Sequence, residues 1–138
     1  MDIKKIKLRM YDPRLDIIRQ INSIDFSKQR LSVSYKNLSK LYEFDDVTIL
    51  MPTGVKDKED KMIYEGDLIY DGKSIYEVYQ NEYSLSYSIK EYDVEALASY
   101  DLNEFAKSSH LTIAGNIYKG LKWSKMKENS LIFSKNII

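Results

Sequence analysis

The chain has 138 residues, of which 43% are hydrophobic and 12% aromatic, so it is long enough to bury a core and too apolar for a disordered protein. It contains 21 basic and 21 acidic residues, so the total charge provides no general attraction to nucleic acid or anionic membranes. It has no cysteine, which excludes disulfides and thiolate metal sites. The twelve tyrosines favour β structure.

The N-terminal residues alternate charged and apolar side chains and do not resemble a signal peptide. No apolar run approaches the roughly 20 residues that span a bilayer. We therefore expect a soluble, intracellular protein without a membrane partner.

The first third of the chain predicts short strands. Residues 3–11 alternate apolar and basic side chains, which predicts a strand, and Asp12-Pro13 ends this strand. Residues 15–24 fit either one helical face or a strand. Residues 27–30 form a predicted turn, and residues 31–35 alternate again.

The next segment, residues 36–44, is polar with scattered apolar residues and has room for one helical turn. Residues 47–51 have the spacing of a strand, which Pro52 closes. Gly54 offers the positive φ that a turn often requires.

The middle of the chain predicts an antiparallel meander. Asp71-Gly72 is the clearest hairpin signal, because this dipeptide suits a type I′ turn. It separates a strand at 68–70 from one at 74–80. Residues 85–89 alternate apolar side chains with serine, which predicts a further strand.

A short helix is predicted near residues 93–100, with Asp93 as its cap, followed by a loop at 101–109. Residues 110–118 form the last predicted strand, in which Gly115 indicates a bulge or a close approach of another backbone segment. The apolar tail at 119–138 is expected to add a strand or to dock on another subunit. The fold class is therefore all-β and mainly antiparallel, in a single domain over residues 1–138.

Candidate catalytic groups are sparse. His110 is the only histidine and has no neighbours in sequence that would tune it. Two acidic clusters, at 43–46 and 57–60, are read as solvated loops rather than as cation sites. Glu65-Gly66-Asp67 is explained by turn geometry. No phosphate-binding loop or nucleophile elbow occurs. We predict no catalytic residue, no metal and no cofactor.

Basic residues concentrate near both ends of the chain. If the protein binds a partner through an arginine–aromatic cluster, the candidates are Arg9 with Tyr11 and Leu121 with Trp123. The same basic segments could hold a nucleic-acid backbone, although the balanced total charge disfavours this alternative.

Three blocks follow one another along the chain: Ile6 to Asp12, the stretch from Met51 to Ile69, and Leu111 to Tyr118. Together they resemble the YopX family of phage and prophage proteins. The central block is similar to the family pattern "TGLKD…IYEGDIV". It departs from that pattern at Glu59-Asp60, where the family often has Asn-Gly at the tip of a charged hairpin.

The resemblance implies coiled, branching β-sheets, self-association into a homo-oligomer and a phage or prophage genome, and hence the cytoplasm of a host cell. It implies no established activity. Residues of the family pattern to which we assign structural roles are Thr53, Gly54, Asp57, Tyr64, Glu65, Gly66, Asp67, Gly115 and Asn116. We expect a non-enzymatic accessory protein that binds macromolecules, with a host protein as one candidate partner. The alternative is a nucleic-acid-binding module.

Overall fold

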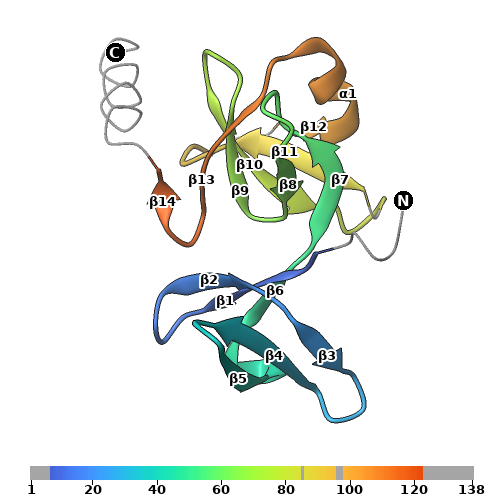
Figure 1. Ribbon diagram of the computed structural model, residues 1–138. Helices are drawn as coiled ribbons and strands as arrows, with labels where there is room; N and C mark the ends of the chain where they lie inside the picture. Colours follow the sequence, from blue (N-terminus) through green and yellow to red (C-terminus); the bar gives the residue numbers. More distant parts are fainter. Residues whose placement is uncertain (1–6, 85, 96–97, 123–138) are drawn as a thin grey trace. The chain divides into compact units, whose positions relative to one another are not determined.

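A computed structural model describes residues 7–84, 86–95 and 98–122. By its internal contacts the chain divides into two compact units, residues 1–52 and residues 53–138. The ribbon in Figure 1 shows that both are built from short strands. No helix in the described ranges combines the length and the apolar character needed to cross a membrane.

The first unit holds two three-stranded antiparallel sheets. One sheet has the order β2-β1-β6, and the other has the order β3-β4-β5. Side chains from both sheets form one core cluster, made by Met10, Ile21, Leu31, Val33 and Tyr42. The strands are β1 (Arg9–Asp12), β2 (Ile17–Gln20), β3 (Ser23–Asp25), β4 (Arg30–Tyr35), β5 (Leu38–Glu43) and β6 (Thr48–Leu50), with a 3-10 helix at Phe44–Asp46.

The second unit contains a six-stranded sheet with the order β12-β11-β10-β9-β13-β14, and a two-stranded ribbon of β7 and β8. Its helix α1 (Leu102–Ser108) inserts the fully buried Leu102 into the core beside Ile69, Val78 and Ile89. The strands are β7 (Pro52–Lys56), β8 (Met62–Tyr64), β9 (Asp67–Tyr70), β10 (Ile75–Gln80), β11 (Tyr87–Glu91), β12 (Tyr100–Asp101), β13 (Thr112–Asn116) and β14 (Gly120–Leu121).

The predicted all-β class with a single short helix is confirmed, but the helix lies at 102–108 rather than near 93–100. Its cap is Asp101, whose carboxylate accepts a hydrogen bond from the Glu104 amide at 3.0 Å. Asp93 instead has a φ of 61° in a turn, which is incompatible with the start of a helix.

One further sequence prediction is wrong. Asp71-Gly72 does not form a two-residue turn, because Tyr70 pairs with Ile75 and the Asp71 carboxylate binds the amides of Lys73 and Ser74 in a longer loop. The strand predicted at 47–51 ends before Pro52, but Pro52 itself opens the next strand, a position where its missing donor is tolerated. The segment 15–24, which fitted either a helical face or a strand, forms β2 and the start of β3.

One other feature was predicted correctly. The register of β13 against β9 shifts at Gly115, which is the predicted bulge. At the start of the tail, Gly120 and Leu121 pair with β13. Most of the tail, residues 123–138, lies outside the described ranges.

Candidate binding site at the open edge of strand β5

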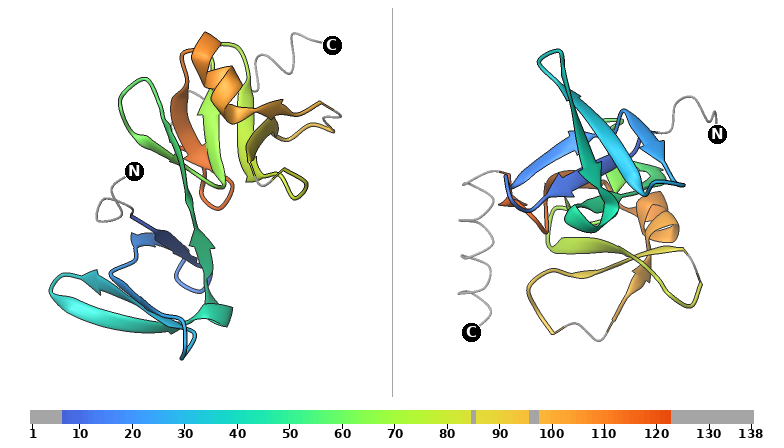
Figure 2. Two further views of the ribbon diagram at one scale, coloured as in Figure 1. Left: turned by 90° about the vertical axis from the view of Figure 1, so that its right-hand side faces the viewer. Right: turned by 90° about the horizontal axis from the view of Figure 1, so that it is seen from below.

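The longest hairpin of the first unit is made by β4 and β5. Tyr35 pairs with Leu38, which leaves Lys36 and Asn37 as a two-residue loop. Both have positive φ, 49° and 66°, as a type I′ turn requires. The two views in Figure 2 show this cyan-to-teal hairpin projecting beyond the other strands of its unit. Tyr35 and Leu38, which flank the turn, are both exposed, so the sheet surface near the tip is uncovered.

Strand β5 is an outer strand of its sheet, and it is longer than the other outer strands of the described sheets. It has 6 residues, whereas β12 and β14 have 2, β3, β6 and β8 have 3, β2 has 4 and β7 has 5. Proteins commonly keep such edges short, because unpaired backbone groups invite another strand. Leu38 and Leu41 on this strand are 75% and 68% exposed. An exposed, apolar edge of this length is an unusual feature of the chain.

The hairpin geometry fixes which backbone groups face outward from β5. Residues that flank a two-residue turn form a hydrogen-bonded pair, and the pattern then alternates along the ladder. Leu38, Lys40 and Tyr42 therefore bond to β4, and the amides and carbonyls of Ser39 and Leu41 point away from it. Phe44 is the next residue expected to bond toward β4, and its amide does donate a hydrogen bond to the Gln29 carbonyl at 2.9 Å. Within the described ranges β5 pairs with β4 alone.

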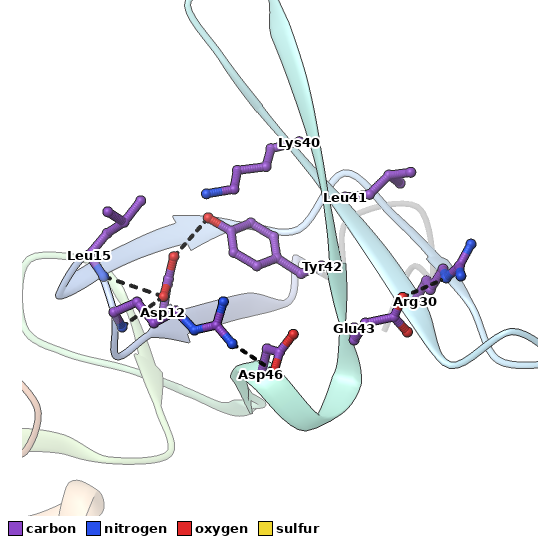
Figure 3. Close-up of a pocket in the computed structure, with 9 residues that line it drawn as sticks. Asp12, Leu15, Arg30, Lys40, Leu41, Tyr42, Glu43 and Asp46 are labelled. Carbon is purple, nitrogen blue, oxygen red and sulfur yellow. Dashed lines mark hydrogen bonds and ion pairs between the residues drawn. The ribbon is translucent and has the colours of Figure 1, made fainter.

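A pocket of about 280 Å³ lies beside β5 (Figure 3). It is lined by side chains from β5, from the end of β1 and the turn after it, from Arg30 of β4 and from the 3-10 helix. At its base the Tyr42 hydroxyl donates a hydrogen bond to the Asp12 carboxylate at 2.9 Å. The other oxygen of Asp12 accepts bonds from the amides of Arg14 at 2.9 Å and Leu15 at 3.4 Å. Asp12 is 2% exposed, so these bonds replace the water it has lost.

The electrostatics of this pair follow from those contacts. Burial acts to raise the pKa of Asp12, but the bonds from Tyr42, Arg14 and Leu15 and the positive charge of Lys40 outweigh it, and the pKa lies below its ordinary value. Burial, together with the bond to Asp12, raises the pKa of Tyr42. Asp12 therefore stays ionised and Tyr42 stays protonated near neutral pH. The pair fixes the base of the pocket and activates neither group as a base or nucleophile.

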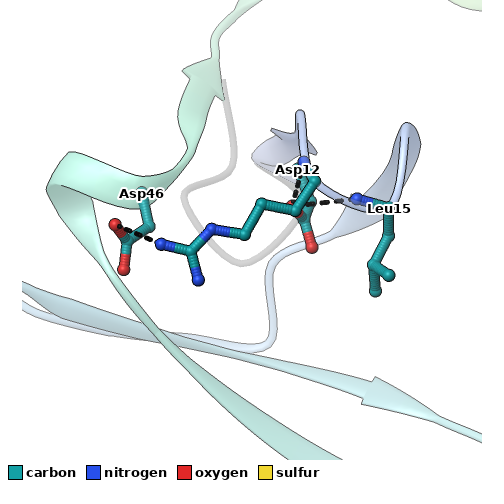
Figure 4. Close-up of polar contacts among 4 residues, drawn as sticks. Asp12, Leu15 and Asp46 are labelled. Atoms are coloured by element: carbon teal, nitrogen blue, oxygen red, sulfur yellow. Dashed lines mark hydrogen bonds and ion pairs between the residues drawn. The ribbon is translucent and has the colours of Figure 1, made fainter.

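Charged groups at the rim are arranged in pairs. Arg14 reaches Asp46 at 3.3 Å (Figure 4), and Arg30 reaches Glu43 at 2.8 Å. The Lys40 ammonium lies 4.8 Å from the centre of the Tyr42 ring. Exposed ion pairs of this kind add at most about 1 kcal/mol to stability. Their role here is to give the edge a defined pattern of charge.

The predicted interaction residues are dispersed. Arg9 and Tyr11 lie two residues apart on β1 and are half-buried, and the Tyr11 hydroxyl donates to Asp16 at 2.8 Å. Leu121 is half-buried in β14 of the second unit. Trp123 lies outside the described ranges. Their role in binding stays a prediction.

Several of the family-pattern residues hold loops of the second unit together. The Thr53 hydroxyl donates to the Ile63 carbonyl at 2.7 Å and so joins β7 to β8. Gly54 has a φ of 84° within β7. The Asp57 carboxylate accepts bonds from the amides of Glu59, Lys61 and Ile113 at 2.9, 2.9 and 3.2 Å.

The Tyr64–Asp67 turn is equally structural. The Asp67 carboxylate accepts a bond from the buried Tyr64 amide at 2.8 Å, and Gly66 has a φ of 86°. A side chain at Gly66 would meet the Tyr118 ring at 3.1 Å. Glu65 is half-buried, and its charge adds to the burial that raises the pKa of Tyr118.

The last two family-pattern residues position the return of the chain after β13. Gly115 packs against the backbone of Gly120, where a Cβ atom would overlap the carbonyl oxygen. The Asn116 side chain accepts bonds from the amides of Tyr118 and Lys119 at 3.0 and 2.8 Å. Each residue meets a requirement of the local backbone.

His110 is exposed and lines a second, open pocket of about 210 Å³ together with Asp57. The Asp57 carboxylate is already bonded to three backbone amides, so it is poorly placed to orient an imidazole. In the acidic cluster at 43–46, Glu43 and Asp46 face arginines instead of converging on one another. Across the described ranges, no group of three or more potential metal ligands lies together.

Sequence reasoning missed the β5 edge itself. The polar composition of segment 36–44 predicts at most one helical turn, whereas the segment forms the turn, strand β5 and the start of the 3-10 helix. The signal was weak but present. Asn37 favours the positive φ of a type I′ turn, and Tyr35 and Leu38 flank it symmetrically.

These features define a small all-β protein with short antiparallel sheets, Asp and Asn side chains that brace its loops, and an open strand edge. The family model described as "YopX protein" matches residues 5–121, so the chain belongs to the YopX family. A crystal structure of protein EF1440 from Enterococcus faecalis is similar, with a TM-score of 0.51 and 17% identity over 81% of this chain and 92% of that chain. No curated protein matches the sequence.

Proposed function

We propose that this protein is a non-enzymatic accessory protein, encoded by a phage or prophage, that associates with itself and binds another macromolecule in the host cytoplasm. The observation that carries the proposal is the outer strand β5, which is exposed at five of its 6 residues. Exposed backbone donors and acceptors flanked by Leu38 and Leu41 suit the addition of a strand from another chain.

The site chemistry is consistent with binding. The Asp12–Tyr42 pair is satisfied by its own contacts, and the rim charges form ion pairs. Such a surface recognises a partner by shape and charge pattern. A host protein is a candidate partner, and the family resemblance motivates self-association.

Self-association is tested by sedimentation velocity of the full chain over a wide range of concentrations. We expect a reversible shift from monomer to a larger species. A strict monomer at the highest concentration would refute the self-association half of the proposal.

Binding to a second macromolecule is tested by capture from extracts of infected cells with the wild type and a Leu38→Ser/Leu41→Ser variant. The matched control is Tyr83→Ser, because Tyr83 is 98% exposed but lies in the second unit. We expect a partner that the control retains and the β5 variant loses. Equal capture by all three proteins would count against β5 as the binding surface.

A second candidate function is nucleic-acid binding, and one cluster favours it. The Tyr35 ring is 53% exposed, with the Arg19 guanidinium 4.6 Å and the Lys36 ammonium 5.3 Å from its centre. An exposed ring flanked by cations suits stacking and phosphate contact. Affinity for single-stranded oligonucleotides should fall steeply with salt. Absence of binding at low salt would eliminate this candidate.

A further inference from the structure

We propose that β5 pairs antiparallel with β5 of a second copy of this chain, about a two-fold axis that passes beside Leu41. This inference rests on the proposed self-association and names the surface that performs it. It identifies the occupant of the open edge as an identical strand, because the pattern of β5 is complementary to itself.

The backbone register allows this pairing. Ser39 and Leu41 direct their amides and carbonyls outward, and Glu43 has the same alternation as these two residues. With Leu41 on the axis, its amide and carbonyl bond the partner's Leu41 in both directions. Ser39 then lies opposite the partner's Glu43. Each outward group therefore meets a group of opposite hydrogen-bonding character.

The side chains agree with the same register. Lys40 faces the partner's Tyr42, so that an ammonium already 4.8 Å from its own Tyr42 ring meets a second ring. On the other face, Leu41 meets the partner's Leu41, and 68% of its surface is available for burial. Ser39 can donate its hydroxyl to the partner's Glu43. No directly opposite pair brings like charges together.

A lysine on an edge strand usually discourages such pairing. Here Lys40 lies over the Tyr42 ring, on the face of the hairpin that carries the core residues Leu31 and Val33. The Lys40 ammonium therefore lies over a face of the sheet and does not block the edge at which the partner strand would pair. Because pairing of one 6-residue strand with another buries little surface, we expect a reversible dimer that depends on concentration rather than a permanent one.

The first experiment is disulfide trapping in the otherwise full and unchanged chain. The protein has no cysteine, so a single Leu41→Cys substitution supplies the only thiol. The Cα atoms of a hydrogen-bonded pair in an antiparallel ladder lie about 5.5 Å apart, which is within the Cα–Cα range that a disulfide spans. The matched control is Ser34→Cys, which is also exposed and on the same face but on the inner strand β4. We expect rapid covalent dimerisation of the first variant alone.

The second experiment measures the dimer dissociation constant of Leu41→Lys by sedimentation, with Ser34→Lys as the control of equal charge. In Leu41→Lys the two lysines would face each other on the axis, and their repulsion should raise the dissociation constant by about tenfold or more. The control should leave the dissociation constant near the wild-type value. Circular dichroism confirms folding, which both exposed positions should preserve.

The outcomes separate this inference from the broader proposal. If the wild type self-associates but Leu41→Cys traps no faster than Ser34→Cys, or Leu41→Lys leaves the constant unchanged, pairing through β5 is wrong and self-association stands. If the wild type is a strict monomer, both are wrong. Trapping and weakening confined to the Leu41 variants would establish the interface.

Discussion

The carboxylate of Asp57 accepts a hydrogen bond from the backbone amide of Ile113 at 3.2 Å, although 56 residues separate the two in sequence. The Lys58 amide bonds the Leu111 carbonyl at 2.8 Å beside it. The charged hairpin after β7 is thereby attached to the start of β13. This contact joins the central and the last of the three blocks by which the chain resembles its family, and it gives both a structural purpose.

Replacing Asp57 by Asn should lower the free energy of unfolding by about 2 kcal/mol, because a buried carboxylate that bonds three amides loses its charge and one acceptor. Urea denaturation measures the change. Asp60→Asn is the control, since Asp60 is exposed at a turn with a φ of 66°, which Asn tolerates. Equal loss in both variants would contradict the role of Asp57.

Gly115→Ala should be among the most damaging single changes in the second unit. The added Cβ would overlap the Gly120 carbonyl oxygen and approach the Leu121 Cα at 2.9 Å, at a φ of 149°. We expect a loss of roughly 3 kcal/mol or more, or failure to fold. Gly72→Ala, with a φ of 99° and nothing within 4 Å, carries only backbone strain of about 1–2 kcal/mol. The melting temperatures of the two variants test this order.

The Asp12–Tyr42 bond predicts a dependence of stability on pH. The folded pKa of Asp12 lies below its ordinary value of 3.8, so its contribution is complete above pH 3.8 and is lost as pH falls through the lower folded value. The folded pKa of Tyr42 lies above 10.0, so its contribution is present below pH 10.0 and is lost as pH rises through the folded value.

Tyr42→Phe removes the hydrogen bond that connects these two titrations. We expect it to destabilise the protein by about 1–2 kcal/mol at pH 7, with a smaller difference from wild type at pH 3 and at pH 11. Chemical denaturation across this pH series provides the measurement. A difference that stayed constant with pH would show that the variant acts through packing alone.

The helix cap supplies a prediction that separates the expected helix from the observed one. Asp101→Ala should cost about 1 kcal/mol, because the Glu104 amide loses its acceptor. Asp93→Gly should be neutral or stabilising, because Asp93 has a φ of 61° that glycine adopts without strain. Thermal unfolding compares the two. A larger loss of stability in Asp93→Gly than in Asp101→Ala would instead indicate that Asp93 caps the helix.

Alternation of apolar and polar residues predicted the strand at 31–35, where Leu31 and Val33 are core residues. The strand at 68–70 was instead indicated by the turn signal that follows it, and it shows no alternation because Leu68 and Ile69 are both fully buried. Alternation failed at β5, where only Tyr42 is buried and the exposed leucines remove the periodic signal. The cap was misplaced because Asp93 and Asp101 both precede residues suited to a helix. Only the tertiary position of Leu102, fully buried in the core, decides between them.

The candidate site was even less visible in the sequence. Asp12 and Tyr42 are 30 residues apart, and their contact depends on how two sheets pack in one core. The prediction of Arg9 and Tyr11 as contact residues rests on residue type alone. An open edge is a property of strand order, and strand order in this unit is set by the turn at Lys36-Asn37 and by the pairing of β1 with β6.

That pairing also shapes how the chain acquires its structure. Most ladders here join strands that follow one another, and such local hairpins form within microseconds. Each unit has one ladder between strands distant in sequence, β1 with β6 in the first and β9 with β13 in the second. Leu50 is the last residue of the ladder between β1 and β6. The first unit can therefore fold as soon as this residue has emerged from the ribosome, while the rest of the chain is still being synthesised. Closure of the other half must wait until translation has passed Asn116.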